Sequence, residues 1–192
     1  MSTGRLRRVL TNAGFVAYDW GLGTNTGPKS DFDGWLAEID DTLHRLFLDR
    51  KQKISLVGWS LGGIYARKVA KRHPRMVKQV ITLGTPWKDF ETGTNVGGVY
   101  KIINRGKTSL SEKLRLRLRQ IPEVPLTAIY SKNDGIVAWQ TCVLRPDTMA
   151  ENIEVNKASH LGMCANPDVM RLVAETLSRK PGSRPKALSM HG

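Results

Sequence analysis

Ser60 lies at the centre of the sequence Gly58-Trp59-Ser60-Leu61-Gly62, a pattern that suits a nucleophilic serine. A serine hydroxyl is a weak nucleophile until a base removes its proton, so its position relative to a base decides its chemistry. Glycines on both sides allow a sharp turn from a strand into a helix, with Ser60 at the apex and the Leu61 N–H directed at a developing oxyanion. The alternative is a structural turn whose serine caps the helix that follows.

A nucleophilic serine needs a general base, and the chain offers four histidines. His44 and His73 are expected inside or at the end of helices, and His191 lies near the end of the chain. His160 instead follows a late predicted strand, in a loop from which a base can reach back to the serine. We therefore predict His160 as the base, and the alternative is a buried structural histidine.

The third group is a carboxylate that orients the imidazole and stabilises its charged form. Asp134 follows the apolar run at residues 126–130, which places it at the carboxyl end of a predicted strand. Its alternative role is purely local, because Asn-Asp-Gly is a common turn sequence. Asp89, after the preceding strand, is the substitute acid, and Asp147 fits less well because it follows no strand.

Predicted strands alternate with predicted helices, which indicates an α/β fold with a mainly parallel sheet covered by helices on both faces. The predicted strands are residues 15–20, 54–57, 77–83, 126–130 and 153–155. The predicted helices are residues 5–13, a helix capped by Asp31 or Asp33 and ending near 49, one from the Ser60 turn to about 73, and 167–178.

Residues 87–125 interrupt this alternation and form a predicted cap or lid-like insertion within a domain that spans residues 1–179. Ser109 and Glu112 have the spacing of a capping box and open a helix that continues through Leu118. An insertion here would lie over the carboxyl ends of the strands; the alternative is a solvated helix with a basic face. Residues 180–192 lack periodicity and are predicted to be a disordered basic tail.

The composition narrows the class of protein. The 192 residues contain 30 Lys and Arg against 17 Asp and Glu, a net charge of +13. No nucleic-acid-binding motif accompanies this charge, so a basic surface and tail are expected rather than nucleic-acid binding. No apolar run approaches the roughly 20 residues that span a bilayer. The two cysteines form no CxxC pair, and neither a metal site nor a cofactor is expected.

Several segments together resemble one family. They are VGWSLGG at 57–63, ITLGTPW at 81–87, YSKNDGIVAW at 130–139, ASHLGM at 158–163 and, more loosely, YDWGLGTNTGP at 18–28. The chain is similar to bacterial α/β-hydrolases related to lipases and esterases, over residues 15–177. The resemblance implies an α/β-hydrolase fold with Ser60 as nucleophile, Asp134 as acid and His160 as base. It implies no particular substrate.

The sequence departs from this family before its first predicted strand. Family members carry further amino-terminal strands and a His-Gly or Pro-Gly loop that donates a second oxyanion N–H, and the first fourteen residues contain neither. Either Met1 is internal to a longer product, or the chain is a shortened member, weakly active or dimerised through an open sheet edge. We expect a cytoplasmic protein as written, and a secreted or membrane-associated one if the amino terminus is truncated.

The leading functional hypothesis is a carboxylic-ester hydrolase that acts on a small-molecule or lipid-like acyl ester through an acyl-enzyme. An acyltransferase with the same residues, or a hydrolase-fold binding protein with weak or no activity, are the alternatives. Peripheral contact with an anionic membrane and a homodimer are further open expectations. Cys142 and Cys164 flank His160, and we favour two free thiols over a disulfide that braces this loop.

Overall fold

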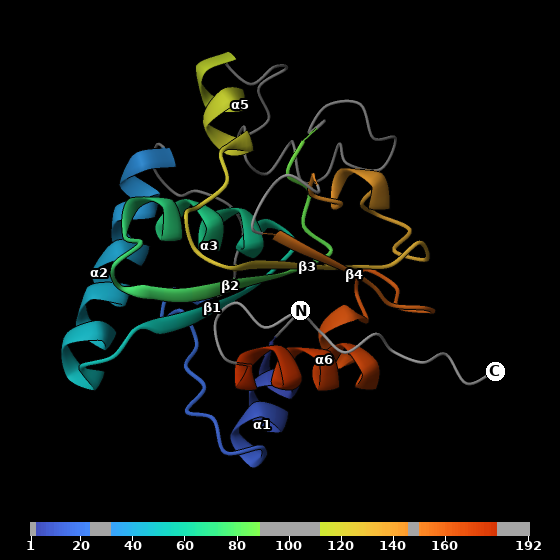
Figure 1. The fold of residues 1–192 in the computed structure, drawn as a ribbon, viewed down its shortest axis with the longest axis horizontal. Coiled ribbons are helices and arrows are strands. Elements are labelled where there is room, and N and C mark those ends of the chain that lie inside the picture. Colours follow the sequence, from blue (N-terminus) through green and yellow to red (C-terminus); the bar gives the residue numbers. More distant parts are fainter. Residues whose placement is uncertain (1–2, 24–31, 89–111, 146–149, 180–192) are drawn as a thin grey trace.

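A parallel sheet forms the centre of the protein (Figure 1). The structure, a computed structural model, describes residues 3–23, 32–88, 112–145 and 150–179. The four strands are β1 (Ile54–Trp59), β2 (Val77–Leu83), β3 (Leu126–Tyr130) and β4 (Ala150–Glu154). They lie in the order β1-β2-β3-β4, and every neighbouring pair is parallel. All four carboxyl ends therefore meet at one edge of the sheet.

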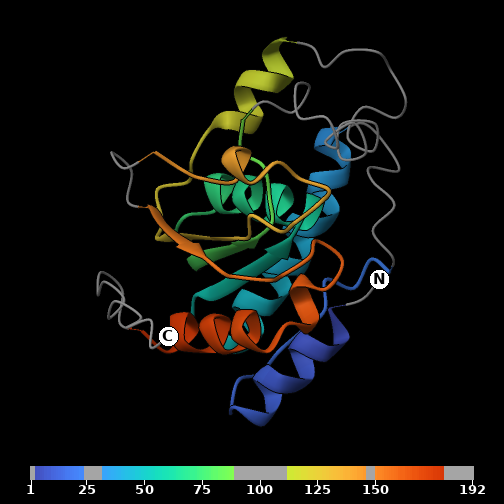
Figure 2. The same cartoon turned by 90° about the vertical axis from the view of Figure 1, so that its right-hand side faces the viewer.

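Helices cover both faces of the sheet, as predicted. One face carries α2 (Phe32–Arg50) and α3 (Leu61–Arg72), and the other carries α1 (Gly4–Asn12) and α6 (Pro167–Ser178). Figures 1 and 2 both show α1 and α6 side by side on their face. A further helix, α5 (Glu112–Arg119), lies beyond α3, and short 3-10 turns occur at Trp139–Thr141 and Met163–Ala165.

The alternation of side chains along the inner strands divides the apolar interior into two cores. Val80 and Ala128 belong to the core under α2 and α3. Their neighbours Ile81 and Ile129 belong to the core under α1 and α6. Both strands are largely buried on both faces, so they carry apolar residues on both faces rather than on alternate positions.

The two cysteines lie in different cores. Cys142 packs in the core of α2 and α3, and Cys164 packs in that of α1 and α6. Both are buried free thiols, so the disulfide that we had considered does not form in this structure. The favoured prediction of two free thiols agrees with this arrangement.

The predicted strand at residues 15–20 is wrong. This segment is extended but forms no strand ladder. Phe15 and Ala17 pack against the core of α1 and α6, whereas Val16 and Tyr18 are exposed. A strand requires a partner for its backbone, and this segment pairs with none of the described strands. Among the described strands, β1 pairs only with β2, so no neighbour occupies its outer edge.

The remaining predicted elements occur with small shifts of their ends. The strand expected at residues 54–57 continues to Trp59. The one expected at 153–155 is β4, which begins at Ala150 and ends at Glu154. Of the predicted insertion, the structure describes α5 and its flanks, whereas residues 89–111 and the predicted tail at 180–192 lie outside the described residues. No described helix is long and apolar enough to cross a membrane.

A buried lysine holds α5 against α3. The Lys68 ammonium donates hydrogen bonds to the carbonyl oxygens of Arg117 and, at 3.2 Å, Gln120. Both carbonyls lie at the carboxyl end of α5, where a cation is favoured. The Arg117 guanidinium also pairs with both carboxylate oxygens of Asp33 on α2. Helix α5 is thus fixed to both helices of this face.

The buried position of Lys68 is unfavourable for the charged form of its side chain. Burial and the positive charges of Arg67, Arg117 and Lys71 lower the pKa of Lys68 to about 7. An unfolded chain keeps Lys68 protonated up to a pH of about 10.4. Between these values the unfolded state binds one more proton, so this group makes the free energy of unfolding rise with pH.

We therefore predict that Lys68→Met removes this pH dependence while keeping most of the buried stem. Between pH 7 and pH 9.5, the free energy of unfolding of the wild type should rise relative to that of the variant by at least about 1 kcal/mol. Urea unfolding curves of both proteins at the two pH values measure the difference. Parallel behaviour of the two proteins would contradict the prediction.

Candidate active site

Ser60 occupies a strained turn between the last residue of β1 and the first residue of α3. Its φ of 53° and ψ of −122° are rare for a residue with a side chain. Its N–H donates to the Leu83 carbonyl at 2.9 Å. Its carbonyl accepts from the Thr85 hydroxyl at 2.9 Å and from the Gly63 N–H at 3.0 Å. These bonds to the end of β2 and to α3 hold the backbone in a conformation it would otherwise leave.

Only some of the glycines around Ser60 have the role that the sequence predicts for them. A Cβ atom at Gly58 would lie 2.5 Å from the Gly62 carbonyl oxygen, so the turn does need glycine there. A Cβ at Gly62 would meet nothing within 4 Å, whereas one at Gly63 would lie 2.2 Å from the Thr85 hydroxyl. The prediction is right for Gly58 and wrong for Gly62; the second tight position is one residue later.

The structure brings the three predicted side chains together. His160 Nε2 lies 2.9 Å from Ser60 Oγ, and His160 Nδ1 lies 2.7 Å from Asp134 Oδ2. Ser60 follows β1, Asp134 follows β3 and His160 follows β4, so the parallel order of the strands places all three at the carboxyl edge. The imidazole can therefore accept a proton from the serine while its other nitrogen donates to the carboxylate.

Asp134 serves the turn and the histidine with different oxygen atoms. Oδ1 accepts the N–H groups of Ile136 at 3.0 Å and Val137 at 2.6 Å, which closes the turn. Oδ2 faces His160. The two roles that the sequence left as alternatives coexist, and the carboxylate is fixed before it meets the imidazole. Both Asp134 and His160 are buried, which strengthens their interaction.

The other candidate histidines and acids do not join this cluster. His44 and His73 pack against each other, and His73 pairs with Asp40 at 3.1 Å on the side of α2. Asp89, Asp147 and His191 lie outside the described residues. Leu61 begins α3, and a first-turn N–H has no partner inside its own helix, so its role as oxyanion donor stays a prediction.

Cysteine chemistry does not compete with the serine. Burial raises the pKa of Cys142 to about 12 and that of Cys164 to about 12. Since the thiolate is the reactive form, both thiols are inert at neutral pH. Among the described residues, no group of three His, Cys, Asp or Glu side chains is arranged to hold a metal ion.

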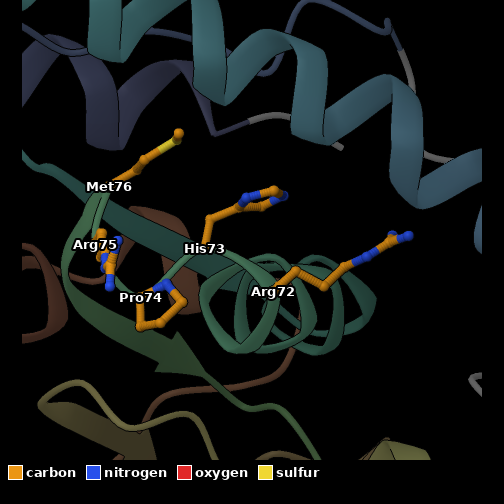
Figure 3. A pocket seen from close by; sticks show the side chains of 5 residues that line it. All are labelled: Arg72, His73, Pro74, Arg75 and Met76. Carbon is orange, nitrogen blue, oxygen red and sulfur yellow. The ribbon is translucent and has the colours of Figure 1, made fainter.

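A surface pocket of about 330 Å³ lies at the opposite end of α3 from Ser60. It is lined by Arg72, His73, Pro74, Arg75 and Met76. Figure 3 shows that these side chains do not converge on one point. The Arg72 guanidinium is already paired with Asp40 at 3.0 Å. This pocket is therefore separate from the cluster around Ser60.

Sequence reasoning missed the residues of the loop after β2. Thr85 is buried and bonds the Ser60 carbonyl, and Gly84 lies against the Asp134–His160 pair. The signal in the sequence is a Gly-Thr-Pro run directly after a predicted strand. The structure places this run beside the serine turn. In the sequence analysis this run serves only as part of the family resemblance.

Solved structures of several enzymes share this fold at low sequence identity. The monoacylglycerol lipase of Paleococcus ferrophilus is 18% identical, with a TM-score of 0.58 over 91% of this chain and 87% of that chain. A meta-cleavage product hydrolase from Pseudomonas fluorescens is 14% identical, with a TM-score of 0.58 over 92% and 86%. A variant of tomato methylketone synthase I is 12% identical, with a TM-score of 0.64 over 92% and 91%.

No curated protein matches the sequence closely enough to count as a relative. The model of the alpha/beta hydrolase family, however, matches residues 3–176, almost all of the described chain. The parallel sheet, the helices on both faces and the serine turn at the carboxyl edge agree with that match. The chain belongs to the alpha/beta hydrolase family.

Proposed function

We propose that this protein is a serine hydrolase that cleaves carboxylic esters through an acyl-enzyme. The observation that supports the proposal is the chain of contacts from Asp134 Oδ2 to His160 Nδ1 at 2.7 Å and from His160 Nε2 to Ser60 Oγ at 2.9 Å. These are hydrogen-bond distances, and their order matches nucleophile, base and orienting acid. Membership of a hydrolase family supports the same reaction class.

In the first half of the reaction, Ser60 Oγ bonds to the acyl carbon while its proton moves to His160 Nε2. The Leu61 N–H stabilises the resulting oxyanion, and the Asp134 carboxylate stabilises the imidazolium. The bond from the acyl carbon to the alkoxy oxygen then breaks, and the proton passes from His160 to the departing alcohol. In the second half, water attacks the acyl carbon while His160 Nε2 takes one of its protons. The bond from the acyl carbon to Ser60 Oγ then breaks, His160 returns the proton to Ser60 Oγ, and the carboxylic acid leaves.

We propose a lipid-like acyl chain on the ester. Leu161, next to His160, is about half exposed, and Leu116 on α5 is 59% exposed. An apolar side chain beside the base suits an apolar acyl group, which gains by leaving water. The shared fold with a monoacylglycerol lipase is in keeping with such a substrate.

The direct test uses a fluorophosphonate probe, which reacts only with an activated serine. We predict that the wild type is labelled and hydrolyses p-nitrophenyl esters, and that Ser60→Ala loses both, with a fall in kcat/KM of about a thousandfold or more. Circular dichroism of the variant should match that of the wild type. A folded wild type that the probe does not label would refute the proposal and favour a binding protein. Faster product formation with added alcohol would identify acyl transfer.

The identity of the acid has its own test. Asp134→Asn keeps the shape of the side chain but removes the charge that stabilises the imidazolium, so kcat should fall by about a thousandfold or more. Steady-state kinetics on Asp134→Asn and on Asp89→Asn compare the two candidates. A larger loss in Asp89→Asn than in Asp134→Asn would reverse the assignment.

Gly84 leaves space for the acid and the base. It has a φ of 52°, and a Cβ there would lie 2.9 Å from Asp134 Oδ2 and 3.3 Å from His160 Nδ1. We predict that Gly84→Ala displaces this pair and lowers kcat by about tenfold to a hundredfold.

The matched control is Gly14→Ala. Gly14 also has a positive φ, of 89°, but a Cβ there would meet nothing within 4 Å. Both variants should lose about 1 kcal/mol or more of stability through backbone strain. Only Gly84→Ala should lose activity in the folded state, as measured by kcat below the melting transition. Equal kcat in the two variants would exclude the role of Gly84.

A further inference from the structure

Trp59, the residue before Ser60, reaches across the site to His160. Its indole N–H donates to the His160 carbonyl at 3.0 Å, and the two residues are 101 positions apart in the sequence. Its ring lies against the imidazole, with 5.5 Å between the ring centroids and 41° between the planes. Trp59 is partly buried and packs against the core of α1 and α6. It is therefore anchored on the sheet side of the site.

These contacts complete the support of the His160 backbone. The His160 N–H donates to the Asp134 carbonyl at 2.8 Å. The His160 carbonyl accepts from Trp59 and, at a longer 3.4 Å, from the Met163 N–H. The loop that carries the base is thus tied on one side to the acid and on the other to the residue adjacent to the nucleophile.

We propose that Trp59 is a positioning residue for His160. It acts through two contacts: the indole N–H fixes the backbone of the base, and the indole ring fixes the plane of the imidazole. The ring adds a second effect, because the face of an indole attracts a cation and so favours the imidazolium formed during acyl transfer. This inference rests on the proposed function for its catalytic meaning, while the positioning itself concerns only the geometry of this chain.

A small displacement of the base has a large effect on the rate. Proton transfer requires a heavy-atom distance near 2.6–3.2 Å, and His160 Nε2 lies 2.9 Å from Ser60 Oγ. A net hydrogen bond contributes about 1 kcal/mol, which corresponds to a five- to tenfold change in rate if it acts on the transition state. We therefore expect that loss of Trp59 changes the position of the His160 imidazole relative to Ser60 Oγ.

The experiment compares Trp59→Phe, which removes the N–H and keeps a ring, with Trp59→Leu, which removes both. Trp59→Phe should lower kcat about five- to tenfold, and Trp59→Leu should lower it further, with KM changed less than twofold in both. A residue that bound the substrate would instead change mainly KM. The rate of fluorophosphonate labelling should fall in the same order.

The control is Trp87→Phe. The Trp87 indole also donates its N–H to a backbone carbonyl, that of Val143, in a contact that involves none of the three site residues. Trp87→Phe loses the same kind of hydrogen bond as Trp59→Phe, so the free energy of unfolding should fall by a similar amount in the two variants. Trp87→Phe should nevertheless keep the kcat of the wild type. Equal kcat in Trp59→Phe and Trp87→Phe would overturn the proposal.

A second readout does not depend on activity. The proton shared by His160 Nδ1 and Asp134 gives a downfield imidazole signal in proton NMR, which Asp134→Asn identifies by its loss. That signal should weaken or shift in both Trp59 variants and stay in place in Trp87→Phe. If the fluorophosphonate does not label the wild type but the imidazole signal still changes in the Trp59 variants, the proposed function is refuted and the positioning role is supported. If the imidazole signal is the same in the wild type and in both Trp59 variants, the positioning role is refuted, whether or not the probe labels the protein.

Discussion

The backbone conformation of Ser60 is the constraint on which the site depends. A side-chain-bearing residue with a positive φ costs of the order of 1–3 kcal/mol, so the surroundings must hold it in place. The parallel register does this: Trp59 pairs with Leu83, and Leu83 pairs with Ile129, so the ends of β1, β2 and β3 are level. The Leu83 carbonyl and the Thr85 hydroxyl are then within reach of both backbone groups of Ser60. The sheet stabilises the strained turn through the loop of its neighbouring strand.

Helix α3 holds the surrounding loops with two buried cations. Arg67 is fully buried and donates to the Pro86 carbonyl at 2.9 Å, directly after Gly84 and Thr85. Burial lowers the pKa of Arg67 to about 10, so it stays charged at neutral pH. Lys68, one position later, holds α5. Buried charges are costly for stability, and here the two side chains bond the backbone of the loop after β2 and of the carboxyl end of α5.

Local patterns in the sequence predict the inner strands and the long helices, and they predict that Ser60, Asp134 and His160 lie together at one edge of the sheet. The segments 77–83 and 126–130 are rich in apolar residues because both faces of the sheet are covered, and β2 and β3 have those bounds. Asp134 and His160 were found from their places after strands, since the carboxyl ends of parallel strands meet. Residues 15–20 do not form the predicted strand, because their local sequence says nothing of a hydrogen-bonding partner for the backbone.

What the sequence did not reveal depends on contacts between distant segments. Gly63 is constrained by Thr85, and Trp59 by His160, and neither relation leaves a periodic signal. The contacts of Trp59 also link the turn to the base. The residue that ends β1 contacts the histidine with its side chain, and the next residue in the chain presents the nucleophile. Any shift of the turn relative to the His160 loop must therefore break the indole hydrogen bond or carry the histidine with it, which keeps the distance between Ser60 Oγ and His160 Nε2 short.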